Sequence, residues 1–240
     1  AKLDKAISDK TRMIILNSPS NPSGSNYSKE ELDSLAKVLV KHPNIVVVTD
    51  DIYEHILWGD SEFNNILNVS PELYNRTIVV NGVSKAYSMT GWRIGYAAGP
   101  EEIIKAMKKI QSQSTSNPNS IAQAAATTAL EGHQDFIQEF VEIYKKRHDV
   151  VIDAIKKIDG VNVIKSDGTF YIFPDMNNLI ERLDDVSNDI ELAEFFLNQA
   201  EVAMVPGSAF GSPGCMRISF ATSMDNIEMG MERVINSVKR

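Results

Sequence analysis

Three short apolar runs, each followed by a helical or turn-rich stretch, constrain the fold of this 240-residue chain more than any other feature. The runs are rich in β-branched residues and lie at Met13–Leu16, Ile45–Val48 and Thr77–Val80. Between the first two, Lys29–Val40 has helical spacing, and Ser28 with Glu31 forms the pattern of a capping box at its start. Continuous apolar strands separated by helices are typical of a parallel sheet that is covered on both faces. The sequence therefore predicts an α/β fold with a mostly parallel sheet, to which residues 94–98 add one more strand.

The pattern changes after Pro100. Two helices are predicted at 101–111 and 121–130, and residues 134–158 have the spacing of one long amphipathic helix. Short strands are then predicted at 161–163, 169–172, 202–204 and 216–219, with helices at about 190–199 and 225–238. We therefore expect residues 1–132 to form part of a large domain and residues 133–240 to form a smaller α+β domain, joined through the long helix.

Composition excludes several classes of protein. The net charge is −8, so a broad basic patch for nucleic acid is not expected. Cys215 is the one cysteine, and the four histidines have no partner at metal-ligand spacing, so we expect no metal site. No apolar run approaches the roughly 18 residues that span a bilayer. These features favour a cytoplasmic enzyme that binds neither membrane nor nucleic acid.

The segment Gly82–Gly95 carries the strongest chemical signal. Lys85 follows the strand run that ends at Val80 and lies in a loop of small residues. Most lysines are solvated surface residues, but a lysine after a buried strand can lose its proton and act as a Schiff-base amine. Arg93 offers a planar fork that suits a phosphate, and Ser84 adds a hydroxyl donor beside the lysine.

Asp50 closes the second apolar run. An acid in this place can be merely a helix N-cap, or it can be a carboxylate at the edge of a buried sheet, where it needs a cationic partner. A protonated heterocyclic nitrogen would be such a partner, and the two interpretations are evenly matched on these residues alone. A lysine, a phosphate-binding arginine and an upstream acid are together what pyridoxal 5'-phosphate chemistry asks of a protein.

In these residues the chain resembles the class I aminotransferases, the fold-type-I family of pyridoxal-phosphate enzymes that includes aspartate aminotransferase. The matching motifs are Ser-Asn-Pro-Ser-Gly at 20–24, Asp-Asp-Ile-Tyr at 50–53, Ser-Lys-Ala-Tyr-Ser-Met-Thr-Gly-Trp-Arg at 84–93 and Met-Arg-Ile-Ser-Phe-Ala at 216–221. They occur in the family's order over nearly the whole chain. The third motif is most similar to bacterial-type aspartate aminotransferases.

The resemblance implies a role for each matched residue. The cofactor-binding residues would be Asn21, Asp50, Tyr53, Ser84, Lys85 and Arg93. Among them, Lys85 is the catalytic residue, Asp50 pairs with the pyridine nitrogen, and Tyr53 and Asn21 bond the cofactor's phenolic oxygen. Asn21 also lies near the substrate carboxylate, and Arg217 clamps the substrate α-carboxylate.

Two departures from the family pattern affect the interpretation. Gly82 stands where many members carry a serine for the phosphate, which leaves more of that binding to Ser84 and Arg93. The family also has a long N-terminal portion before the Asn-Pro motif, and these residues do not contain it. We therefore expect the chain to be the C-terminal portion of an aminotransferase, an N-terminally truncated fragment.

The resemblance implies transamination between an amino acid, with aspartate the first choice, and a 2-oxo acid such as 2-oxoglutarate, in a homodimer. Two alternatives stay open at this stage. The same fold and lysine serve pyridoxal-phosphate-dependent β-lyases, and the isolated chain can be a catalytically silent fragment of the scaffold.

Overall fold

The computed structural model describes residues 2–239, which group into two compact units. The first unit comprises Ala1–Pro19 and Asn26–Gln138, and the second comprises Ser20–Ser25 and Glu139–Arg240. The short segment Ser20–Ser25 thus makes its contacts with the second unit, although its neighbours in sequence belong to the first.

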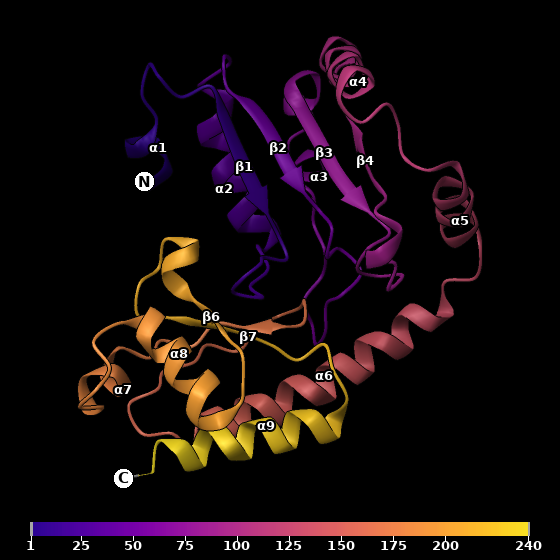
Figure 1. Ribbon diagram of the computed structural model, residues 1–240. Coiled ribbons are helices and arrows are strands. Elements are labelled where there is room, and N and C mark those ends of the chain that lie inside the picture. Colours follow the sequence, from indigo (N-terminus) through magenta and orange to yellow (C-terminus); the bar gives the residue numbers. More distant parts are fainter. Residues whose placement is uncertain (1, 240) are drawn as a thin grey trace. The chain divides into compact units, whose positions relative to one another are not determined.

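A four-stranded sheet forms the centre of the first unit (Figure 1). Its strands, in spatial order, are β1 (Met13–Asn17), β2 (Val46–Asp50), β3 (Thr77–Gly82) and β4 (Gly95–Ala98). The first three are parallel, and β4 pairs antiparallel with β3. The register places Asn17 beside Asp50 and Asp50 beside Val80, so the carboxyl ends of these strands meet at one edge. The predicted α/β fold with a mostly parallel sheet is confirmed.

Helices α2 (Lys29–Val40) and α3 (Ile66–Val69) cover one face of this sheet (Figure 1). The apolar cluster that they bury consists of Leu16, Leu32, Ala36, Leu39, Val47, Ile66 and Leu73. The predicted capping box is confirmed, because Ser28 Oγ accepts from the Glu31 N–H at 3.2 Å and Glu31 Oε2 accepts from the Ser28 N–H at 2.9 Å. Removal of these apolar side chains from water stabilises this layer.

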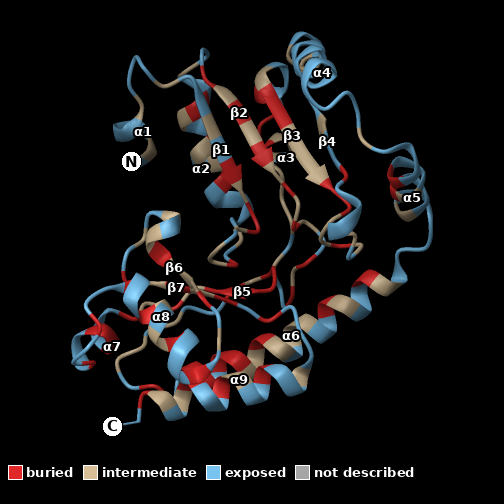
Figure 2. Cartoon of the chain, in the orientation of Figure 1, coloured by how far each residue is buried: buried red, intermediate tan, exposed pale blue. Residues whose placement is uncertain are grey.

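The opposite face of β1 is exposed within the described residues. Met13 and Ile15 alternate along the strand with Ile14 and Leu16, and their exposed fractions are 51% and 67%. Helix α4 (Glu101–Ser114), which is mostly pale blue in Figure 2, has no buried residue. The prediction of a sheet covered on both faces is therefore wrong at β1, because nothing in residues 2–239 buries the second row of its side chains.

The remaining elements of the first unit are α1 (Lys2–Ala6), η1 (Pro71–Arg76), η2 (Thr90–Trp92) and α5 (Ser120–Glu131). Helix α5 matters for the site because it buries Ala122 and Ala126 against Val83 and Ile94. This contact anchors both ends of the loop that connects β3 with β4.

A small antiparallel sheet lies within the second unit. Its strands, in spatial order, are β5 (Tyr171–Ile172), β7 (Met216–Ser219) and β6 (Val205–Pro206). The other elements are α6 (Asp135–Ile155), which enters from the first unit, α7 (Asn177–Arg182), α8 (Asp189–Ala200), η3 (Gly207–Phe210) and α9 (Met224–Ser237). No helix in residues 2–239 combines the length and the apolar character that crossing a lipid bilayer requires.

Two strands expected in the second half are not strands. Residues 161–163 contribute only an isolated bridge, between Asn162 and Asp175. Residues 202–204 instead form the exit from α8, because Glu201 turns the chain with a left-handed backbone (φ 54°) and the Val202 N–H donates to Phe196 O at 3.2 Å. The strand begins only at Val205, where the chain reaches β7.

Candidate active site

Asp50 is the last residue of β2 and lies at the carboxyl edge of the parallel strands. Its neighbour in the register, Asn17, donates from Nδ2 to Asp50 O at 3.1 Å. The Asp50 carboxylate is half-buried, and its Oδ1 accepts from the Ile52 N–H at 3.3 Å. Burial raises the pKa of Asp50 above its ordinary value, while the Ile52 N–H and the charge of Lys85 act in the opposite direction. Asp50 is therefore an acid whose ionised form a nearby cation would stabilise.

Lys85 lies three residues beyond the end of β3 and is half-buried. Its Nζ is 5.6 Å from the centroid of the Tyr53 ring, which is 2% exposed. Asp50 ends β2 beside Val80 of β3, and Lys85 lies against the Tyr53 ring, so the first unit brings these three predicted site residues to the same edge of the sheet. This juxtaposition follows from the parallel register of β2 and β3.

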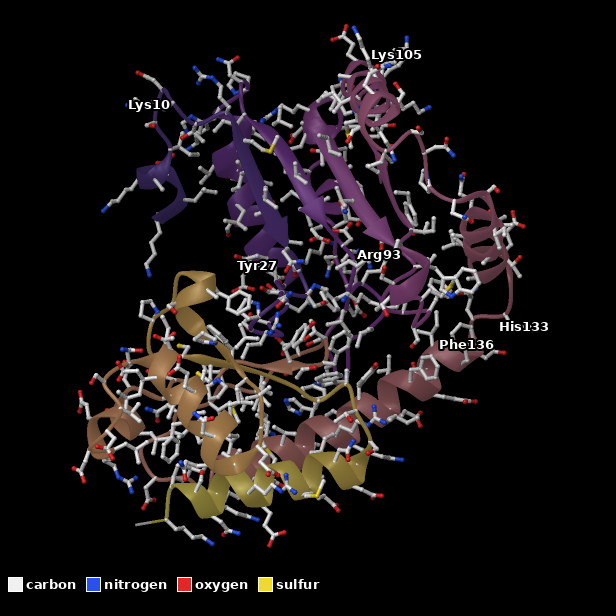
Figure 3. All side chains as sticks on the ribbon, viewed as in Figure 1. Lys10, Tyr27, Arg93, Lys105, His133 and Phe136 are labelled. Carbon is white, nitrogen blue, oxygen red and sulfur yellow. The ribbon has the colours of Figure 1, made fainter. Side chains whose placement is uncertain are left out.

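The two predicted phosphate-binding residues flank the anchored loop between β3 and β4. Ser84 is half-buried beside the buried Val83. Arg93, which is labelled in Figure 3, is exposed and precedes the buried Ile94. Arg93 has a left-handed backbone (φ 56°), and its Nη1 donates to Thr90 O at 2.8 Å. Its side chain is thereby tied to the η2 turn. The binding of a phosphate by these two residues stays a prediction.

Asp51 is a buried carboxyl group that the sequence reasoning left without a role. It is 3% exposed, and it accepts from Thr49 Oγ1 and from Asn65 Nδ2, each at 2.5 Å. Burial raises the pKa of Asp51 to about 6 against the lowering effect of these two hydrogen bonds. Asn65 is also the N-cap of α3, so the network ties the residues after β2 to that helix. In the sequence, the pair of adjacent acids at 50–51 is the one feature that indicates a buried carboxyl group here.

The second unit brings together the other two predicted site residues. Arg217 lies on β7, the central strand of the small sheet, and its Nη1 donates to Asn21 Oδ1 at 2.9 Å. The guanidinium carbon is 4.6 Å from the ring centroid of Tyr171 and 5.0 Å from that of Phe210. Within residues 2–239, Arg217 Nε is buried and has no hydrogen-bond partner. The guanidinium group therefore has donor capacity that no group in residues 2–239 uses, and such capacity is what a carboxylate-binding arginine requires.

Asn21 is held in this place by contacts of the segment Ser20–Ser25 with residues 166–168, which we call the glycine clamp because they centre on Gly24. Gly24 O accepts from the N–H groups of Asp167 and Gly168 at 2.9 and 3.0 Å. Gly24 is buried with φ +71°, and a Cβ there would lie 2.2 Å from Ser166 Cβ. The segment can hold this position only because residue 24 has no side chain.

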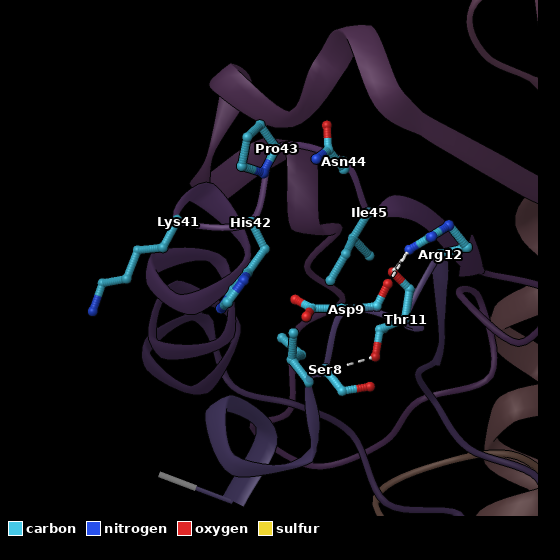
Figure 4. Close-up of a pocket in the computed structure, with 10 residues that line it drawn as sticks. Ser8, Asp9, Thr11, Arg12, Lys41, His42, Pro43, Asn44 and Ile45 are labelled. Atoms are coloured by element: carbon cyan, nitrogen blue, oxygen red, sulfur yellow. Dashed lines mark hydrogen bonds between the residues drawn. The ribbon is translucent and has the colours of Figure 1, made fainter.

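A pocket of about 560 Å³ in the first unit does not include any of these residues. It is lined by residues 7–9, 11–12 and 41–45, which precede β1 and β2, and therefore lies at the amino ends of these strands (Figure 4). Its polar side chains include Arg12, whose Nη1 donates to Asp9 O, and His42. In parallel α/β sheets the ligands bind at the carboxyl ends of the strands, where Asp50 and Lys85 lie.

Comparison with known proteins gives a consistent result. The family model described as aminotransferase class I and II matches residues 1–234. The chain is 53% identical over 97% of its length to an aspartate/prephenate aminotransferase of Nitrosomonas europaea. The crystal structure of the aspartate aminotransferase from Rhizobium meliloti superposes on 100% of this chain with a TM-score of 0.94 and 44% identity. The crystal structure of an aromatic aminotransferase from Pyrococcus horikoshii superposes on 99% of this chain with a TM-score of 0.91 and 36% identity.

The chain spans about three-fifths of the length of these proteins. It covers 60% of the Nitrosomonas relative, 61% of the Rhizobium chain and 62% of the Pyrococcus chain. Each of the three thus contains a counterpart of nearly all of these residues together with further chain.

Proposed function

The chain belongs to the class I and II aminotransferase family, and on this premise we propose that the protein containing it catalyses transamination between an amino acid and a 2-oxo acid. Aspartate is the proposed amino donor, because relatives at 53% and 44% identity are named aspartate/prephenate aminotransferase and aspartate aminotransferase. The proposed acceptor is 2-oxoglutarate. We further propose that the protein acts in the cytoplasm as a homodimer, with residues 1–132 and 133–240 in its large and small domains.

Aminotransferases of this family use pyridoxal 5'-phosphate, and the residues present fit that group chemically. The cofactor has an aldehyde, a phosphate and a pyridine nitrogen that can be protonated. Lys85 offers the amine, Ser84 and Arg93 offer donors for the phosphate, and Asp50 offers an acid. Because burial raises the pKa of Asp50, a protonated ring nitrogen would supply the cationic partner that its ionised form needs.

Lys85 is the residue that moves protons in the proposed reaction. When bound, the cofactor supplies an electron sink for the negative charge that develops at the substrate α-carbon. With the cofactor in place, Lys85 Nζ would accept the proton from the substrate α-carbon as a general base and would return it as a general acid. Asp50 would keep the ring nitrogen protonated, and the Tyr53 hydroxyl would bind the phenolic oxygen. The same role for Asn21 stays a prediction from the family resemblance.

Arg217 orients the substrate. Its guanidinium group binds the α-carboxylate, and Asn21, already bonded to Arg217 Nη1, fixes the rotation of that group. A carboxylate held by a positioned guanidinium group loses its rotational freedom before the reaction begins, which lowers the entropic part of the barrier.

One observation carries the proposal: Lys85 Nζ lies 5.6 Å from the Tyr53 ring centroid, and the register of β2 and β3 sets Asp50 beside Val80, so amine, phenol and acid share one sheet edge. The test uses the full-length protein loaded with pyridoxal phosphate. Borohydride reduction, digestion and mass spectrometry are expected to locate the cofactor on the peptide that contains Lys85. Lys85→Ala is expected to lower aspartate–2-oxoglutarate turnover by at least about 10³-fold, since it removes a positioned acid–base group.

Lys105→Ala is the matched control, because Lys105 is an exposed lysine of α4 in the same unit and forms a surface ion pair with Glu101. It should leave turnover and labelling unchanged. A Lys85→Ala protein with near-normal turnover would overturn the proposal. Identification of the products separates transamination from β-elimination, and the names of the relatives favour the former.

A further inference from the structure

We propose that Phe210 and Tyr171 are positioning residues, which hold the Arg217 guanidinium in place for the substrate carboxylate. This inference rests on the proposed function, in which Arg217 binds that carboxylate. Neither ring would bind the substrate carboxylate itself. Both would contribute to its affinity by positioning Arg217.

Two aromatic rings lie against the Arg217 guanidinium group. Both ring centroids lie within the distance at which a cation is attracted to an aromatic face, at 4.6 Å for Tyr171 and 5.0 Å for Phe210. The strand order explains one of them, because Tyr171 lies on β5 and β5 pairs with β7, the strand of Arg217. The other ring arrives from the η3 turn. The two contacts therefore come from separate elements of the second unit.

The charge of Arg217 is not neutralised within the described chain. No carboxylate in residues 2–239 forms an ion pair with it, and its one hydrogen bond goes to the amide oxygen of Asn21. A buried carboxylate beside Arg217 would hold the side chain still but would also compete with the substrate. Aromatic rings restrict the guanidinium without that competition, since they offer no formal negative charge. The arrangement thus combines a fixed arginine with an undiminished affinity for anions.

The turn that carries Phe210 is itself fixed. Asp189, the first residue of α8, is 3% exposed, and its Oδ2 accepts from the Ser208 N–H at 2.6 Å. Burial would raise the pKa of Asp189, but the hydrogen bonds from Ser208 and Gly214 hold it below its ordinary value. The Phe210 ring also meets Phe173 edge-on, with centroids 5.9 Å apart. Because the turn is held at Ser208 and the ring at Phe173, Phe210 is preorganised against Arg217.

The test measures carboxylate binding directly, with maleate as the probe, on the full-length protein loaded with pyridoxal phosphate. Phe210→Leu and Tyr171→Leu are each expected to raise the maleate Kd and the KM for aspartate by roughly 5- to 10-fold, the loss of one cation–π contact. The kcat at saturating substrate should change by less than about 2-fold, because the loss is one of uniform binding. Phe210→Tyr and Tyr171→Phe keep the rings and should bind maleate as the unaltered protein does.

Phe195→Leu is the control for general loosening of the unit. Phe195 is also a half-buried phenylalanine and makes a ring contact of 5.7 Å, but with Phe196 instead of Arg217. It should leave the maleate Kd unchanged. Unaltered Kd in both leucine variants, or a fall in kcat without a rise in KM, would overturn the inference.

Arg217→Lys distinguishes this inference from the function on which it rests. The loss of a forked, charged donor should weaken maleate binding by roughly 10- to 100-fold. If Arg217→Lys weakens binding while Phe210→Leu and Tyr171→Leu do not, the positioning role alone is wrong. If Arg217→Lys itself binds maleate normally, the proposed carboxylate site is wrong.

Discussion

The two units hold their chemically important side chains in different ways. In the first unit, Asp50 ends β2 and Lys85 follows β3, so the register of two parallel strands already brings them to one edge. In the second unit, Arg217 and Asn21 are 196 positions apart in the sequence and meet because a glycine clamp and two aromatic rings fix them. Backbone pairing places the first set, and side-chain contacts between loops place the second.

This difference has a consequence for how each set tolerates change. A residue at a strand end keeps its place as long as the sheet forms, because the ladder of backbone hydrogen bonds does not depend on its neighbours' side chains. A residue on a clamped loop keeps its place only if the clamp closes. The second unit should therefore be sensitive to single atoms at its clamp, and the first unit should be sensitive chiefly to the charges that its sheet edge buries.

Gly24→Ala is expected to have the largest effect on stability, because the added methyl group would overlap the residues that the glycine clamp brings together. The new Cβ would lie 2.2 Å from Ser166 Cβ and 2.9 Å from Gly168 O, on a backbone with φ +71°. We expect the free energy of unfolding to fall by about 3 kcal/mol, from strain at positive φ and from overpacking together. Urea denaturation of the full-length protein measures it.

Gly59→Ala separates the two causes. Gly59 has nearly the same backbone, φ +70°, but no heavy atom lies within 4 Å of a Cβ built there. It should cost only the backbone strain, about 1 kcal/mol. Equal effects of Gly24→Ala and Gly59→Ala would show that the clamp does not depend on close contact, and the contrast between the units would lose its main support.

Asp51→Asn tests the buried charge of the first unit. The pKa of Asp51 is raised to about 6, so the folded state binds a proton that the unfolded state has released above pH 4. The contribution of this group to stability is full below its unfolded pKa and is lost as the pH rises through about 6. Relative to Asp51→Asn, the unaltered protein should therefore lose on the order of 2 kcal/mol between pH 4 and pH 7.

Asparagine has nearly the same size as aspartate but does not titrate. Any hydrogen bond that the substitution removes therefore changes the free energy of unfolding by the same amount at pH 4 and at pH 7. Asp60→Asn is the control for the removal of one carboxylate, because Asp60 lies on an exposed turn beside Gly59. A pH dependence of stability that is the same in the Asp51→Asn protein and in the unaltered protein would mean that another group is responsible.

The same contrast explains what could be predicted from the sequence. Local patterns predict the strands of the first sheet, the capping box at Ser28, and the places of Asp50 at the end of β2 and Lys85 just beyond β3. Periodicity and caps can be recognised in residues that are close together in the sequence. Asn21 and Arg217 were found by resemblance to a family. Their mutual contact belongs to no local pattern.

The contacts that no local pattern encodes are those between distant loops. Tyr171 lies in the strand predicted at 169–172, and nothing in the sequence around Tyr171 or Phe210 indicates that both rings meet Arg217. The strand predicted at 202–204 failed for a related reason, because the left-handed residue Glu201 delayed the pairing with β7 until Val205. Partners far away in the sequence decide such positions.

Removal of helix caps should have the smallest effect and should be the same in both units. Ser28 Oγ accepts from the Glu31 N–H at the start of α2, and Asn188 Oδ1 accepts from the N–H groups of Ile190 and Glu191 at the start of α8. Ser28→Ala and Asn188→Ala should each lower the free energy of unfolding by about 1 kcal/mol, since each leaves N-terminal N–H groups without their side-chain acceptor.

Neither should change the maleate Kd, because a cap acts within one turn of its helix. If Asn188→Ala weakened maleate binding and Ser28→Ala did not, the start of α8 would be part of the support for Arg217, through the adjacent Asp189 that holds the η3 turn.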